Sequence, residues 1–215
     1  MLNRRTRYLE VALNSTLIEA YAIIDRLPKS ERILVEAGTP LIKRYGTDVI
    51  GDLKKRWGGD VIADLKTMDR GETEVRLAKD AGASAVICLG LAPIETINAC
   101  IASCKEHGLD SMVDMMNVDY PVGILRKLKK LPTVVMLHRG VDEETFNKNK
   151  PIPYIHINKI RSSYDVLIAI AGGDTIREVQ RAAFNDANIV VVWKEFFNAT
   201  EFTGNLAEEF LRAVK

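Results

Sequence analysis

Cysteine is scarce in this sequence. Its three cysteines include no CxxC pair, which disfavours both a disulfide framework and a zinc site built from thiolates. Cys88 lies within the apolar run AVICLG, and Cys100 and Cys104 are spaced i, i+4, on one face of a helix. Because reduced cysteine packs as a small hydrophobic residue, we expect all three thiols to be buried packing groups.

Long apolar runs and an excess of one charge are also missing. No run approaches the ~20 residues that span a bilayer, and the amino-terminal segment MLNRRTRYLEVALN lacks the apolar stretch of a secretory signal. We therefore expect a cytoplasmic protein. Lys and Arg number 30 against 29 Asp and Glu, which leaves no electrostatic footprint for nucleic acid or an anionic membrane. A small molecule is the expected partner.

Short strand-like runs dominate what is present. The chain has 215 residues, 47% of them hydrophobic, enough for one sizeable core. Eight apolar or β-branched runs alternate with charged segments of helical period, which is typical of a parallel sheet. They cover residues 8–13, 33–36, 61–65, 85–90, 111–115, 133–137, 165–173 and 188–193. We predict one α/β domain over residues 1–215, a closed (β/α)8 TIM barrel.

Glycines mark the ends of two predicted helices. The segments RGETEVRLAKDAGAS and KEHGLDSM place Gly82 and Gly108 where a helix ends in a left-handed residue. Between His138 and Asp165 the helical period weakens, and NKNKPIPYIHIN contains two prolines. We predict a long loop with one short helix there.

Polar residues follow the predicted strands, at the barrel end where active sites form. They comprise four acids, three basic residues, an amide and a glycine pair. They are Asn14, Glu36, Asp64, Lys66, Asp114, His138, Arg139, Gly172, Gly173 and Asp174. Charged side chains gathered at one end of a barrel destabilise the fold unless they pair with each other or bind a ligand.

Glu36 and Asp64 are candidate metal ligands. They end neighbouring predicted strands, which places their carboxylates close enough to share a hard divalent cation. Mg²⁺ needs only one or two carboxylates besides water and substrate oxygens, and Mn²⁺ is an alternative. In the other interpretation, both acids form a buried ion network with Lys66.

The segment DLKTMD carries a family resemblance. Asp64, Lys66 and Asp69 resemble the D-x-K-x-x-D signature of the orotidine 5'-monophosphate decarboxylase superfamily. Other segments resemble flanking motifs of its 3-hexulose-6-phosphate synthase branch, in register from about residue 8 to 173. They are VEAGTPLIK (35–43), AKDAGAS (78–84), MVDMM (112–116), HRGVD (138–142) and IAGG (170–173).

Four residues favour one branch of that superfamily. Orotidylate decarboxylases lack an HRG-type segment, so His138 and Arg139 favour the sugar-phosphate branches. Met68 and Asp114 resemble the synthases, where 3-keto-L-gulonate-6-phosphate decarboxylases typically have alanine and glutamate. The resemblance thus implies a lyase-type, metal-dependent aldolase that condenses formaldehyde with D-ribulose 5-phosphate. The alternative is the decarboxylase or another sugar-phosphate lyase.

The resemblance also implies roles for individual side chains. His138, with an unperturbed pKa of about 6.5, suits removal of the C1 proton of the sugar, and Lys66 would hydrogen-bond the enediolate. Asp114 would hold a substrate hydroxyl or orient Lys66. Asp69 would reach the active site of a second barrel, which implies a homodimer with shared sites. Arg139 is either a substrate contact or an exposed rim charge.

Two segments depart from the family pattern. Asn14 stands where the family usually has aspartate, so it can hydrogen-bond a substrate hydroxyl but supplies no charge. At the last strand, Trp193 and Lys194 replace a glycine-rich phosphate loop. We predict phosphate binding by Gly172 and Gly173, with Lys194 as either the second half of the site or a solvated charge. A catalytically impaired sugar-phosphate-binding barrel is therefore a further alternative.

Two other histidines carry no such expectation. His107 and His156 have no acids converging on them in the sequence, so we expect surface or hydrogen-bonded core positions for both.

Overall fold

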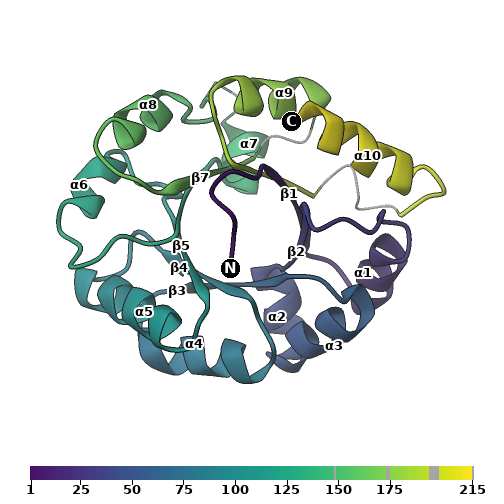
Figure 1. Cartoon of the computed structure of the whole chain (residues 1–215), viewed down its shortest axis with the longest axis horizontal. Coiled ribbons are helices and arrows are strands. Elements are labelled where there is room, and N and C mark those ends of the chain that lie inside the picture. Colours follow the sequence, from purple (N-terminus) through teal and green to yellow (C-terminus); the bar gives the residue numbers. More distant parts are fainter. Residues whose placement is uncertain (148, 173–174, 194–198, 215) are drawn as a thin grey trace.

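The computed structural model describes residues 1–147, 149–172, 175–193 and 199–214. Its parallel strands close into one barrel in chain order, β1 to β8, and Figure 1 shows the helices as a ring around them. The strands are β1 (Tyr8–Leu13), β2 (Ile33–Ala37), β3 (Val61–Thr67), β4 (Ala85–Leu89), β5 (Asp110–Asp114), β6 (Val134–His138), β7 (Leu167–Ala171) and β8 (Ile189–Val192). The predicted (β/α)8 barrel is confirmed.

The helices follow the strands as expected for this fold. They are α1 (Leu17–Ile24), α2 (Thr39–Tyr45), α3 (Asp48–Trp57), α4 (Gly71–Asp80), α5 (Ile94–Glu106), α6 (Pro121–Leu125), α7 (Val141–Phe146), α8 (Ile155–Arg161), α9 (Ile176–Phe184) and α10 (Thr203–Ala213). Gly82 and Gly108 lie just beyond α4 and α5 with φ of +93° and +70°, so both predicted helix ends are confirmed.

The segment between His138 and Asp165 differs from the prediction, because it holds two short helices. The first, α7, has three acidic residues in its first turn, and Gly140 N–H donates to the Glu143 carboxylate. Pro151 and Pro153 lie ahead of α8, where a missing N–H costs nothing. The two prolines, which we predict to interrupt the helical pattern, instead precede the start of a helix.

The strands are buried on both faces. One hydrophobic cluster lies between the sheet and the helices and includes Cys88, Cys100 and Cys104, all free thiols, as predicted. The other fills the barrel interior, from Leu34 and Ile62 round to Val191, and packs against Leu2 and Trp193. Leu2 N–H also donates to Asp110 at the start of β5 (2.7 Å), so the amino-terminal segment covers the barrel end opposite the polar mouth.

No helix in the described part of the chain is both long and apolar enough to cross a membrane.

Candidate active site

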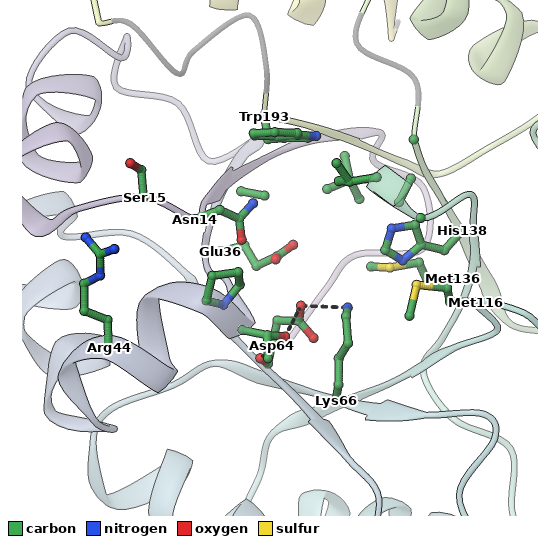
Figure 2. A pocket seen from close by; sticks show the side chains of 18 residues that line it. Asn14, Ser15, Glu36, Arg44, Asp64, Lys66, Met116, Met136, His138 and Trp193 are labelled. Atoms are coloured by element: carbon green, nitrogen blue, oxygen red, sulfur yellow. Dashed lines mark hydrogen bonds and ion pairs between the residues drawn. The ribbon is translucent and has the colours of Figure 1, made fainter. Parts of the chain in front are cut away.

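A cavity of about 480 Å³ opens at the carboxyl ends of the strands (Figure 2). Six of the predicted site residues line it: Asn14, Glu36, Asp64, Lys66, His138 and Gly172. Trp193 also lines it, and in Figure 2 its ring lies across the cavity from Lys66. These six residues, named from their places at strand ends, therefore lie around one cavity.

A backbone irregularity in β3 places Lys66. Asp64 pairs with Ile87 of β4, but the next pair is Thr67 with Cys88, so extra residues of β3 bulge out of the ladder. Lys66 lies in this bulge with a φ of +43°, a conformation that is costly for a side chain with a Cβ. Such local strain is concentrated at functional sites in proteins.

The buried carboxylate of Asp114 joins the two basic groups of the site. Its Oδ2 accepts hydrogen bonds from Lys66 Nζ (3.0 Å) and contacts His138 Nδ1 (2.8 Å). Lys66 Nζ also donates to Asp64 Oδ2 at 2.8 Å, the contact dashed in Figure 2. Asp114 has no exposed surface and does not line the cavity. Of its two predicted roles, orienting Lys66 therefore fits, and it orients His138 as well.

The charges in this network shift the pKa of each partner. Burial acts to raise the pKa of Asp114, but His138 and Lys66 outweigh it and lower that pKa below the usual range. Burial acts to lower the pKa of His138, but Asp114 outweighs it and raises that pKa. Burial likewise opposes the ammonium of Lys66, yet Asp64, Asp114 and Glu36 raise its pKa, so Lys66 stays charged.

The contact with Asp114 also fixes the orientation of the imidazole. With Nδ1 facing the carboxylate, the other ring nitrogen of His138, Nε2, is left to exchange a proton. His138 lines the cavity, where a substrate would meet it. A base oriented by a buried carboxylate is an arrangement suited to proton transfer.

The site also holds oxygen atoms suited to a hard cation. Asp64 Oδ1 is buried and has no hydrogen-bond partner among the described residues. The Glu36 carboxylate points into the cavity in Figure 2. Burial first, and then the charges of Asp64 and Glu10, raise the pKa of Glu36 well above its usual value. A divalent cation would relieve this crowding of acids, so the donor set fits Mg²⁺ or Mn²⁺.

The remaining predicted residues lie elsewhere. Arg139 is no exposed rim charge: it is largely buried and donates to Gly172 O (2.8 Å), so it braces the end of β7. Asp69 is exposed in the turn after β3 and does not line the cavity. Gly173, Asp174 and Lys194 lie outside the described residues, and the roles of Gly173 and Lys194 at a phosphate stay predictions.

The two other histidines do not line the cavity. His107 is half-buried at the end of α5. His156 is half-buried on α8, and its Nδ1 is buried without a hydrogen-bond partner in the described part of the chain. It is therefore not a fully hydrogen-bonded core histidine, which was one of the two positions that we expected.

Polar residues that were missed in the sequence include Ser15 and Arg44, which line the cavity, and Thr39 and Glu10. Thr39, at the start of α2, donates from its hydroxyl to Asp64 Oδ2 (2.8 Å). Glu10 is fully buried in β1, and burial raises its pKa to about 7, with the Glu36 carboxyl opposing the rise. The available signal was that Glu10 and Asn14 lie four residues apart, on the same face of a strand. No sequence signal pointed to Thr39.

Comparison with known proteins places the chain in a family. A model described as "Orotidine 5'-phosphate decarboxylase / HUMPS family" matches residues 7–198. The chain belongs to this family. The matched range includes the segment DLKTMD and the other motifs on which the resemblance rests.

Similar proteins include enzymes described as bifunctional. A protein of Methanocella arvoryzae named "Bifunctional enzyme Fae/Hps" is 38% identical over 97% of this chain and 53% of the relative. One of the same name from Archaeoglobus fulgidus is 40% identical over 92% of this chain and 50% of the relative. The chain thus spans about half the length of the curated relatives it matches.

Solved structures show the same family fold. The 3-hexulose-6-phosphate synthase of Salmonella typhimurium has a TM-score of 0.87 and 29% identity, covering 96% of this chain and 98% of the other. A 3-keto-L-gulonate-6-phosphate decarboxylase from Vibrio cholerae has a TM-score of 0.79 and 19% identity, covering 98% and 99%, a likeness that extends to the fold alone.

Proposed function

We propose that this chain is a 3-hexulose-6-phosphate synthase, an aldolase that condenses formaldehyde with D-ribulose 5-phosphate. The observation that carries the proposal is the buried Asp114 carboxylate, which orients both a histidine and a lysine at the cavity. This arrangement supports proton removal next to a carbonyl and binding of the resulting anion. The likeness to a synthase structure along almost all of both chains adds support.

His138 and Lys66 divide the chemical work in this proposal. His138 Nε2 takes the C1 proton of the ketose phosphate, and the electron pair left at C1 forms an enediolate. C1 then attacks the carbon of formaldehyde, a carbon–carbon bond forms as the C=O π pair moves to oxygen, and the imidazolium returns a proton to that oxygen. Lys66 remains charged throughout and hydrogen-bonds the enediolate oxygen as negative charge develops.

Glu36 and Asp64 would hold a divalent cation beside these groups. When bound, Mg²⁺ or Mn²⁺ supplies Lewis-acid stabilisation of the enediolate oxygens. Lys66 already neutralises one oxygen of Asp64, so the other oxygen and the Glu36 carboxylate are the atoms left for the ion. Thr39 fixes the orientation of Asp64 through its hydroxyl.

The remaining polar groups would position the sugar phosphate. Asn14 lines the cavity and offers both a donor and an acceptor to a hydroxyl. Gly172 lines it at the end of β7, where backbone amides can meet a phosphate. We also propose a homodimer in which Asp69, exposed on this barrel, completes the site of its partner.

The decisive assay uses purified protein with ribulose 5-phosphate, formaldehyde and Mg²⁺. Consumption of formaldehyde that requires both the sugar and the metal is the expected result. Release of CO2 from 3-keto-L-gulonate 6-phosphate without formaldehyde uptake would favour the decarboxylase. Binding of ribulose 5-phosphate with no turnover of either substrate would favour the impaired barrel.

A further inference from the structure

Glu10 lies directly beneath the floor of the cavity. Its Cα is level with that of Val191 on β8, which lines the cavity, and with that of Leu34 on β2. Ala12, two residues further along β1 on the same face, also lines the cavity. Glu10 therefore points into the barrel interior one position below the surface that a ligand would touch.

The Glu10 carboxyl has no ordinary structural explanation. The side chain is 0% exposed, and neither oxygen has an N–H or hydroxyl partner among the described residues. Apolar side chains, including Leu34 and Val191, surround this level of the barrel. A buried acid without a donor destabilises a fold, so its presence calls for a compensating partner.

The two basic groups nearest these acids, Lys66 and His138, contact other carboxylates. Lys66 Nζ contacts Asp64 and Asp114, and His138 Nδ1 contacts Asp114. Two carboxyls, Glu10 and Glu36, are left. They lie on the paired strands β1 and β2, and each adds its charge to the surroundings of the other.

An added cation would resolve this imbalance. Glu36 faces the cavity, where a cation can reach it. Glu10 lies on the neighbouring strand β1, level with Leu34 and so one inward-facing position below Glu36. A negative group behind a ligand carboxylate strengthens its attraction for a cation and fixes its orientation.

We propose that Glu10 is a positioning residue of the cation site, which holds Glu36 in place and adds negative charge beneath it. The proposal rests on the cation site of the proposed function. Glu10 is not assigned as a direct ligand, because the described residues contain no group of three acidic, histidine or cysteine side chains that could hold a metal ion. It acts on the ion through Glu36.

The test is calorimetric titration of the whole chain with Mn²⁺ and with Mg²⁺, without substrate. Glu10→Gln keeps the shape of the side chain and removes its charge, and we expect about ten- to a hundredfold weaker binding, the usual cost of losing a group behind a metal ligand. Glu36→Gln should weaken binding at least as much. In the double variant the fold-loss of affinity should be smaller than the product of the two single fold-losses, because Glu10 acts through Glu36.

Asp110→Asn is the matched control. Asp110 is another buried acid of a barrel strand, but it lies at the opposite end, where it accepts a hydrogen bond from Leu2 N–H. Its loss should leave cation affinity unchanged whatever it does to the melting temperature. If Glu10→Gln does not fold, Glu10→Leu, which suits the apolar surroundings, replaces it in the same titration.

The outcomes separate this proposal from the one on which it rests. Affinity unchanged in Glu10→Gln but lost in Glu36→Gln would overturn the role of Glu10 and keep the cation site. A parent protein that binds neither ion would overturn both. A loss shared equally by Asp110→Asn would also overturn the role of Glu10, because the effect would then come from the fold.

Discussion

At the scale of single residues, the position of each acid in the barrel decides what it does. Asp114 contacts two basic groups and is held charged, whereas Glu10 and Glu36 face each other and are pushed toward the neutral form. All three are buried, so burial alone does not determine the charge. The difference comes from which side chains the neighbouring strands bring within hydrogen-bonding distance.

Replacing Asp114 should change the titration of His138. In Asp114→Asn, we expect the pKa of His138 to fall, because the carboxylate that raises it is gone. NMR titration of the imidazole protons measures this directly, and His107 and His156 serve as internal references. A His138 pKa equal to that of the parent would contradict the assigned contact.

The same variant should lose stability in a pH-dependent way. Removing one partner of a buried ion pair costs about 3–5 kcal/mol. The lowered pKa of Asp114 gives stability that is present above about pH 4 and lost in acid, and the raised pKa of His138 gives stability lost as pH rises through it. The gap between parent and variant in urea unfolding should thus be widest between about pH 4 and 6.5. A gap that is constant with pH would refute this linkage.

The sequence reveals the residues at strand ends more readily than those within strands. Glu36, Asp64 and His138 were predictable because the carboxyl ends of parallel strands meet at one face. Glu10 was missed because β1 is buried along its whole length, so apolar and polar positions do not alternate in YLEVAL. Lys66 was placed correctly, but its left-handed backbone depends on the bulge, which no residue pattern announces.

At the scale of elements, the ends of β6 and β7 are locked together. Gly172 has a φ of +96°, and a Cβ there would lie 2.4 Å from Arg139 O. Arg139 in turn donates from its side chain to Gly172 O. The backbone that ends β7 is therefore held by β6, which positions the amides proposed to meet phosphate.

Gly172→Ala should therefore cost more than a left-handed alanine alone. Gly108→Ala is the matched control, since its φ is +70° and a Cβ there would meet open space. A left-handed non-glycine residue costs about 1–2 kcal/mol, and we expect Gly172→Ala to exceed that cost in urea unfolding. It should also raise KM for ribulose 5-phosphate. Equal losses of stability in the two variants would show that the close approach to Arg139 is relaxed at little cost.

Element boundaries show where local patterns stop being informative. β1 matches its predicted bounds because its apolar run ends at a polar residue, Asn14. The last-but-one strand was predicted over 165–173 but spans Leu167–Ala171, since the pairing of β7 with β6 begins at Leu167 and ends at Ala171. α7 and α8 are too short for helical periodicity to stand out, and capping and packing define them.

At the scale of the whole molecule, the exposed Asp69 raises the question of assembly. Lys66 faces the cavity, while Asp69, only three residues later, is exposed in the turn and lines no part of it. The side chains near it include Met68, which is 51% exposed, an apolar surface suited to contact with another molecule. These placements support the proposal that Asp69 serves the site of a second barrel.

Subunit mixing tests that proposal. Lys66→Ala and Asp69→Ala proteins should each be inactive, because every site of either homodimer lacks one of the two groups. A mixed dimer has one site with both lesions and one with neither, because the interface of a two-fold dimer is self-complementary. Equal mixing gives half mixed dimers, so about a quarter of the parental activity should return.

Mixing Lys66→Ala with His138→Ala is the control, since both groups line the same barrel's cavity and no intact site can form. Light scattering and a tagged subunit would verify exchange, and a failure to recover activity after verified exchange would place Asp69 outside the active site.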